Sequence, residues 1–297
     1  MSEAAVESPK IWLEMDQAAL DAAYDQTKYA PNHELLRLRR ASSAEIARKR
    51  LPAPLRYQYG PTEIEGLDVY LSDKPHAPIC MFIHGGAWRT GAAADFAGFA
   101  ETFIHAGAHF IVPDFTSVDA AGGDLFPMVE QVRRSVAWVY RNANGFGGDA
   151  DRLFVSGHSS GGHLTGNIVT TDWPRDFDVP FSILKGGLLA SGMYDLKPVR
   201  LSARSRYVNF TDRMEEELSS IRHLDRLHCP LVVAYGTQET PEFQRQSRDL
   251  AKAVAAKGKL AELVVAEGYN HFEIVETMGN PYGLLGYAML GLMGLRK

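Results

Sequence analysis

Two adjacent serines lie in the segment FVSGHSSGGHL, which runs from Phe154 to Leu164. Gly157, Ser159 and Gly161 fit the pattern G-x-S-x-G, with a strand-like RLFVS before it and a helix-compatible GHLTGNIVT after it. A serine at such a strand–turn–helix corner is typical of an acyl-transfer nucleophile, and the glycines tolerate the crowding around the turn. The pattern predicts Ser159 as the nucleophile. A glycine- and serine-rich loop that caps a helix is the alternative interpretation.

A second pair of glycines, Gly85 and Gly86, follows the apolar run PICMF in the segment IHGGAW. Acyl transfer needs backbone N–H donors aimed at the developing oxyanion, and consecutive glycines after a strand let the backbone approach the substrate. We therefore predict an oxyanion hole formed by the N–H groups of Gly85, Gly86 and Ser160. On this interpretation Ser160 acts through its N–H and not through its hydroxyl. A plain Gly-Gly turn would explain the same residues.

A nucleophilic serine needs a base within reach, and the chain order expected in this architecture is serine, then acid, then histidine. His271 is the last histidine of the chain and follows the strand-like run AELVVAEG. We therefore predict His271 as the general base. Other histidines fit less well because they lie before the serine motif, within it or in a polar segment further on, namely His105, His109, His158, His163, His223 and His228.

The acid is expected in the loop after the apolar run PLVVAYG, which contains Glu239 and Glu242. Glu242 falls in the first turn of the next helix, where a carboxylate stabilises the helix dipole, so it has a structural explanation. Glu239 has no such explanation, and we predict it as the acid that orients His271. Asp195, in SGMYDL, follows the preceding strand and is the chief rival.

The elements that must position these residues are eight apolar runs, LRYQYG, LDVYLS, APICMFIHGG, HFIVPD, RLFVSG, FSILKGGLLASG, PLVVAYG and AELVVAEG. Helical stretches at 125–144, 162–171 and 241–257 separate several of them, which indicates a mostly parallel sheet covered on both faces. The first two runs alternate and lie close together, so an antiparallel edge is expected. We predict a single α/β domain over 1–297, with a helical lead-in at 10–50 and a lid inserted at 195–228.

Composition excludes several other classes of protein. The formal charge of −5 and the scattered Lys and Arg residues give no basic stripe for nucleic acid. The most apolar late segment, YGLLGYAMLGLMGL, is shorter than the roughly 20 residues that cross a bilayer, and no secretory signal is recognised at the N-terminus. Cys80 and Cys229 are expected to be buried and unpaired in a reducing, cytoplasmic compartment. No metal or cofactor motif is present, and the run NGFGGD is interpreted as a helix stop.

Four stretches, IHGGAW, VSGHSSGGHL, GTQETPEFQRQS and GYNHFEIVE, together with the opening MDQAALDAAYDQTKYAPNHELL, carry a family resemblance. The chain resembles the α/β-hydrolase fold esterases of the kynurenine formamidase (arylformamidase) group. The resemblance implies the same triad, Ser159, Glu239 and His271, and the same oxyanion loop. It departs from the family in two places: Glu239 stands where an aspartate is frequent, and DFTSVDAAGGDLFP replaces a tyrosine-containing run.

These observations predict hydrolysis of a small aromatic formamide, amide or ester through an acyl-serine, with N-formylkynurenine as the leading substrate. A carboxylesterase or amidase acting on another small molecule is the alternative, and a non-catalytic hydrolase-fold binding protein is the alternative of a different class. The candidate pocket residues are Trp88, Tyr194, Asn209 and Phe272, and a purely structural role is the alternative for each of them. The expected partner is a small molecule, without nucleic acid or membrane. The apolar C-terminal segment would pack on the core or on a second copy, which leaves a homodimer open.

Overall fold

The computed structural model describes residues 8–296, so residues 1–7, on which the expected absence of a secretory signal partly rests, lie outside it. One sheet has the strand order β1-β2-β4-β3-β5-β6-β7-β8. Strands β3 to β8 pair in parallel, whereas β1 pairs antiparallel with β2 and β2 with β4. The expected runs form β1 Leu55–Gln58, β2 Gly66–Tyr70, β3 Ala77–Ile83, β4 His109–Pro113, β5 Gly148–His158, β6 Leu184–Ala190, β7 Leu231–Gly236 and β8 Leu260–Ala266.

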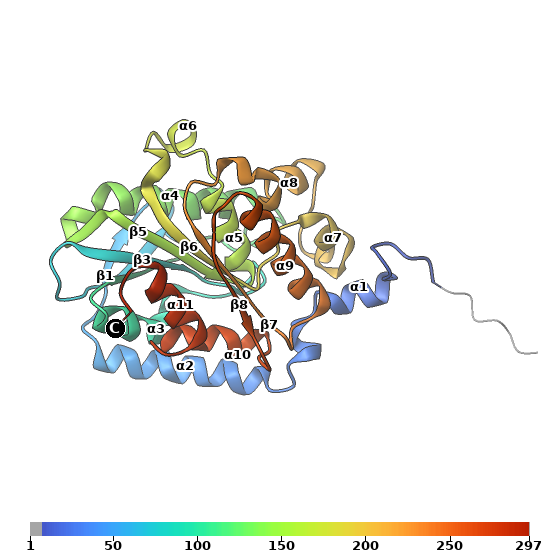
Figure 1. Cartoon of the computed structure of the whole chain (residues 1–297), viewed down its shortest axis with the longest axis horizontal. Helices are drawn as coiled ribbons and strands as arrows, with labels where there is room; N and C mark the ends of the chain where they lie inside the picture. The colour runs from blue at the N-terminus through green and yellow to red at the C-terminus, as the bar shows by residue number, and fades with distance from the viewer. Residues whose placement is uncertain (1–7, 297) are drawn as a thin grey trace, which may run out of the picture.

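Both faces of the sheet are covered by helices (Figure 1). In β3 every residue is buried, and successive side chains point to opposite faces. Ile79, Met81 and Ile83 therefore belong to one apolar cluster, while Cys80 and Phe82 belong to the other. The continuous apolar run in the sequence reflects these two cores, because neither face of the strand meets water.

The helices divide between the two cores. The first core contains residues of α4 Phe126–Asn142, α5 Ser160–Val169 and α9 Pro241–Ala256. The second contains residues of α2 His33–Arg50, α3 Ala97–His105, α10 His271–Glu276 and α11 Leu284–Leu292. The helices predicted from the sequence correspond to α4, α5 and α9, with boundaries that differ by at most two residues. This arrangement confirms the α/β-hydrolase fold.

The N-terminal lead-in is not one continuous helix. It consists of α1 Gln17–Ala23, a 3-10 helix η1 Gln26–Tyr29, and α2. Tyr24 at the end of α1 donates to Glu242 Oε2 at 3.0 Å and accepts from Gln246 Nε2 at 2.7 Å, which ties the lead-in to α9. Glu242 therefore serves structure, as its position in the sequence suggested.

The segment predicted to form a lid, residues 195–228, lies between β6 and β7, and its role as a lid stays a prediction. It contains the short helices α7 Leu196–Leu201, η5 Ala203–Arg206, α8 Asp212–Glu217 and η6 Ser220–Arg226. The remaining short helices are η2 Ala93–Phe96, η3 Ala143–Phe146, α6 Trp173–Phe177, η4 Phe181–Ile183 and η7 Thr277–Gly279. Gly147 follows η3 with φ 79°, as expected for a helix stop. Within residues 8–296, no helix has both the length and the apolar character to cross a membrane. Helix α11 packs on the second core.

Candidate active site

Ser159 occupies the sharp corner between β5, which ends at His158, and α5, which begins at Ser160. Its backbone has φ 60° and ψ −127°, a strained conformation for a residue with a side chain. Both flanking glycines are required by close packing. A Cβ at Gly157 would lie 2.4 Å from the carbonyl oxygen of Gly161, and a Cβ at Gly161 would lie 2.0 Å from that of Ile83. The G-x-S-x-G spacing therefore follows from the geometry of the turn.

The structure brings Ser159, His271 and Glu239 into one hydrogen-bonded chain. Nε2 of His271 lies 2.8 Å from Ser159 Oγ, and Nδ1 of His271 lies 2.9 Å from Glu239 Oε2. Glu239 follows β7, and His271 begins α10, where the Asn270 side chain accepts hydrogen bonds from the first turn. Three residues far apart in the chain thus meet in the order and with the contacts that general-base activation of a serine requires.

Burial controls the charges in this chain. Burial lowers the pKa of His271 to about 3, and the positive charges of Arg204 and Arg40 act in the same direction to a smaller extent. The imidazole is therefore neutral near pH 7 and can accept the serine proton. Burial also raises the pKa of Glu239 to about 7, while hydrogen bonds from Ser191 Oγ at 2.5 Å and Gly236 N–H at 2.7 Å oppose this effect.

The loop after β3 places Gly85, Gly86 and Ala87 along the same cavity as Ser159. Gly86 has φ 127°, and a Cβ there would lie 2.0 Å from the carbonyl oxygen of Thr90, so only glycine fits. Ser160 is the first residue of α5, and its N–H has no acceptor within that helix. Gly85 and Gly86 line the cavity beside Ser159, and Ser160 follows it in the chain; the catalytic role of their N–H groups stays a prediction.

The hydroxyl of Ser160 has a partner that the sequence did not reveal. Ser160 Oγ accepts a hydrogen bond from the backbone N–H of Trp88 at 3.1 Å. Ala87 and Trp88 have φ 56° and 65°, so the loop is held in an unusual conformation at this point. The expectation that Ser160 acts only through its N–H is therefore incomplete, because its side chain also fastens the glycine loop to the serine turn.

Ser159 and His271 open into a cavity of about 940 Å³. One wall comes from the lead-in (residues 21–41), another from the glycine loop and a third from the insertion between β6 and β7 (residues 203–207). Its aromatic lining consists of Tyr24, Phe96, Tyr207 and Phe272. A cavity of this size suits a small organic molecule.

Of the four residues expected to form the pocket, only Phe272 lines this cavity. Trp88 is buried and donates through Nε1 to His163 Nδ1 at 3.2 Å. Tyr194 is fully buried, and its hydroxyl accepts from the Gly192 N–H. Asn209 is exposed and donates to the carbonyl oxygen of Gly122. The expectation for these three residues is therefore corrected: packing directs their side chains into the core or away from the cavity.

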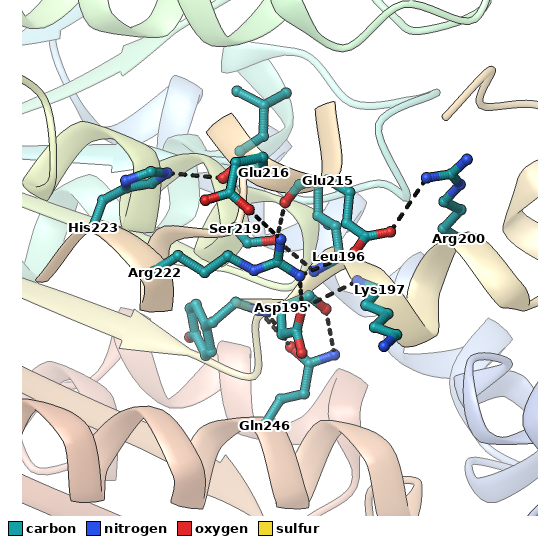
Figure 2. A network of polar contacts seen from close by, with 12 residues as sticks. Asp195, Leu196, Lys197, Arg200, Glu215, Glu216, Ser219, Arg222, His223 and Gln246 are labelled. Atoms are coloured by element: carbon teal, nitrogen blue, oxygen red, sulfur yellow. Dashed lines mark hydrogen bonds and ion pairs between the residues drawn. The ribbon is translucent and has the colours of Figure 1, made fainter. Parts of the chain in front are cut away.

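Asp195, the rival acid, belongs to a polar network on the inserted segment (Figure 2). It caps α7 by accepting from Lys197 N–H and forms an ion pair with Arg222 at 3.2 Å. Arg222 also pairs with Glu215 and Glu216. Asp195 makes no hydrogen bond to His271, so the geometry favours Glu239 as the acid.

The two histidines beside the serine are both buried, and burial lowers their pKa values. His158 lies with its ring centroid 4.4 Å from that of His271, and its pKa is well below the ordinary value. The pKa of His163 falls to about 4. Among the described residues, no cluster of three or more His, Cys, Asp or Glu side chains could hold a metal ion.

Comparison with known proteins connects this site to a family. A model of the prolyl oligopeptidase family matches residues 133–281, and a model named BD-FAE matches residues 67–182. Kynurenine formamidase of Danio rerio is 33% identical over 95% of this chain and 98% of its own length. Esterase LipC of Mycobacterium tuberculosis is 26% identical over 77% of this chain and 59% of its own.

Solved structures share the same fold. A protein from Silicibacter sp. tm1040, described provisionally as a thioesterase, superposes with a TM-score of 0.80 at 21% identity, over 93% of this chain and 98% of that one. A thermophilic esterase from Thermogutta terrifontis superposes with a TM-score of 0.67 at 20% identity, over 82% and 96%. Since the fold, the site and the near full-length relationship agree, the chain is a serine hydrolase that belongs to the kynurenine formamidase family of α/β-hydrolases.

Proposed function

We propose that this enzyme hydrolyses a small aromatic formamide, with N-formylkynurenine as the leading substrate and formate and kynurenine as products. The observation that carries the proposal is the Ser159–His271–Glu239 chain opening into a cavity with aromatic walls. The relationship to kynurenine formamidases over almost the whole chain supports the same chemistry. Glu239, longer than the aspartate frequent in the family, still reaches His271 Nδ1 at 2.9 Å.

The reaction proceeds in two halves. Ser159 Oγ attacks the formyl carbon while His271 Nε2 takes the hydroxyl proton, and the N–H groups of Gly85, Gly86 and Ser160 stabilise the oxyanion. The C–N bond then breaks, and His271 returns the proton to the departing aromatic amine. Water next attacks the formyl-serine with His271 as base, which releases formate and restores the serine hydroxyl. Glu239 keeps the imidazole in the required tautomer throughout.

Hydrolysis of short-chain or aryl esters is the second candidate, and the relationship to esterase LipC favours it. The same nucleophile and oxyanion loop act on both bond types, so the leaving group distinguishes them. Comparing kcat/KM on N-formylkynurenine, an aryl acetate and an anilide tests the choice. The formamidase proposal predicts the highest value for N-formylkynurenine. Equal or faster turnover of the aryl acetate or the anilide would assign the enzyme to the corresponding alternative.

A cytoplasmic location is also proposed. Its support is that Cys80 and Cys229 are both buried and unpaired, which suits a reducing compartment. A homodimer stays a prediction. Helix α11 already packs on the core of its own chain, so its apolar character alone does not demand a second copy.

A further inference from the structure

The cavity next to the nucleophile contains a buried arginine without a carboxylate partner. Arg204 is only 9% exposed, and its guanidinium lies over the Trp88 ring at 5.5 Å. It donates to the Tyr207 hydroxyl at 2.6 Å and to the carbonyl oxygen of Tyr24 at 3.1 Å. Within residues 8–296 it forms no ion pair, and its Nε has no hydrogen-bond partner. A guanidinium has five N–H donors, so several donors of a buried charge remain without acceptors.

Arg40, from α2, also lines the cavity and is in a similar position. It lies over the Phe96 ring at 5.5 Å, and its Nε is buried without a hydrogen-bond partner among the described residues. The carboxylates of Glu276 and Asp95 lie near enough to affect Arg40 electrostatically, yet neither forms an ion pair with it. Arg40 is therefore the less isolated of the two cations.

The acidic side chains that line the cavity are engaged elsewhere. Asp21 pairs with Arg206 at 3.5 Å. Asp25 accepts from Thr27, and Asp95 accepts from the Ala92 N–H. Burying an uncompensated charge is costly, so such a charge in a cavity indicates a ligand of opposite sign.

We propose that Arg204, assisted by Arg40, forms an anion subsite that binds a carboxylate of the substrate. This inference rests on the proposed function and narrows it to small aromatic substrates that carry a carboxylate in addition to the scissile bond. The planar fork of a guanidinium matches a carboxylate in shape and charge. Trp88 and Tyr207 hold the Arg204 fork in place before a ligand arrives.

The location of the subsite fits a role in positioning. The positive charges of Arg204 and Arg40 both reach His271, because they contribute to lowering its pKa. A carboxylate held at Arg204 would therefore lie in the same cavity as the reacting atoms, and the aromatic side chains around it would contact the rest of the molecule. Arg204 is a specificity-determining residue on this proposal, and it takes no part in proton transfer.

Two substrates test the subsite: N-formylkynurenine and the analogue in which a neutral carboxamide replaces its carboxylate. Hydrolysis of either one is measured by the absorbance of the aromatic amine that it releases. The wild-type enzyme should prefer the carboxylate by about tenfold or more in kcat/KM, the size expected for charge-assisted hydrogen bonds. Arg204→Gln should reduce this preference to less than about threefold. Arg204→Lys, which keeps the charge but loses the fork, should give an intermediate preference. Arg40→Gln should reduce the preference less than Arg204→Gln.

Arg213→Gln is the matched control, because Arg213 lies on the same inserted segment, is exposed and pairs with Glu217 outside the cavity. It should leave the preference unchanged. Equal turnover of both substrates by the wild-type enzyme, or an unchanged preference in Arg204→Gln, would overturn the subsite while leaving the formamidase function intact. If the wild-type enzyme hydrolyses neither formamide, the proposed function itself fails.

A measurement on the wild-type enzyme alone covers the case in which Arg204→Gln does not fold. Benzoate should inhibit competitively with a Ki at least about tenfold lower than that of benzamide, which has the same shape without the charge. Equal inhibition by the two compounds would contradict an anion subsite.

Discussion

Replacing Glu239 with glutamine tests the triad with almost no change in shape. Oε1 of Glu239 accepts from Ser191 Oγ and from the Gly236 N–H, while Oε2 faces Nδ1 of His271. The Gly236 N–H can only donate, so the amide oxygen of glutamine must take the Oε1 position. The amide NH₂ then faces His271 and donates to Nδ1. The imidazole is forced to carry its proton on Nε2, where it cannot accept the proton of Ser159.

The wrong tautomer has a large and predictable cost. The equivalent acid-to-amide change in a serine protease lowers kcat about 10⁴-fold, which corresponds to about 5.5 kcal/mol of lost transition-state stabilisation. We expect Glu239→Gln to lower kcat/KM by about 10³- to 10⁴-fold. Asp195→Asn is the matched control, because Asp195 only caps α7 and pairs with Arg222, and it should keep activity within about threefold.

Glu239→Gln should raise the stability of the folded protein even though it lowers activity. Burial raises the pKa of Glu239 to about 7 from its ordinary 4.5, which corresponds to roughly 3 kcal/mol for the ionised form. The folded protein thus binds more protons here than the unfolded chain between pH 4.5 and 7, and this group's contribution to stability falls as pH rises. The Tm of Glu239→Gln, taken relative to the Tm of the wild type, should therefore rise from pH 5 to pH 8.

Steady-state kinetics on an aryl acetate measures kcat/KM of the two variants, and thermal unfolding from pH 5 to pH 8 measures their stability. Retention of more than a tenth of the wild-type kcat/KM by Glu239→Gln would refute the tautomer argument. Loss of turnover in Asp195→Asn alone would reassign the acid.

Two further predictions concern the serine turn and the base. Ser160→Ala keeps the backbone N–H but removes the acceptor of the Trp88 N–H, so kcat should fall about three- to tenfold with little change in KM; an unchanged kcat would show that the hydroxyl does not position the loop. Burial raises the pKa of Glu239 to about 7 and lowers that of His271 to about 3, so kcat/KM of the wild type should fall as pH drops below about 7 because Glu239, and not His271, takes up a proton. In Glu239→Gln, which removes this titrating group, the residual kcat/KM should stay level from pH 8 to about pH 5. A tenfold loss per pH unit beginning near pH 6.5 in that variant would mean that the base titrates like an exposed histidine.

The fold and the reacting residues could be predicted because their signals are local. Buried parallel strands leave continuous apolar runs, as in PICMFI around Met81, and the crowded turn at Ser159 demands glycines at fixed spacing. Chain order then selected His271 and Glu239 from many candidates, and the structure places both beside the serine. The α/β-hydrolase fold is confirmed, and the meeting of these side chains follows from it.

The pocket could not be predicted, because its walls are assembled from segments far apart in the chain. Tyr24 from the lead-in and Arg204 from the insertion meet across the cavity only through tertiary packing. The sequence leaves both a pocket role and a structural role open for Trp88 and Tyr194, and in the structure both side chains fill the core. The sequence also gave no sign that Arg204 would be buried without a carboxylate.

Labelling with a fluorophosphonate tests the central claim most directly. The reagent phosphonylates a serine only when a neighbouring base activates its hydroxyl, so it reports the nucleophile without any assumption about the substrate. We predict time-dependent labelling of one residue in the wild-type enzyme, identified by peptide mass as Ser159, and no labelling of Ser159→Ala. Absence of labelling in the folded wild-type protein would favour a non-catalytic binding protein, and labelling that persists in Ser159→Ala would place the nucleophile elsewhere.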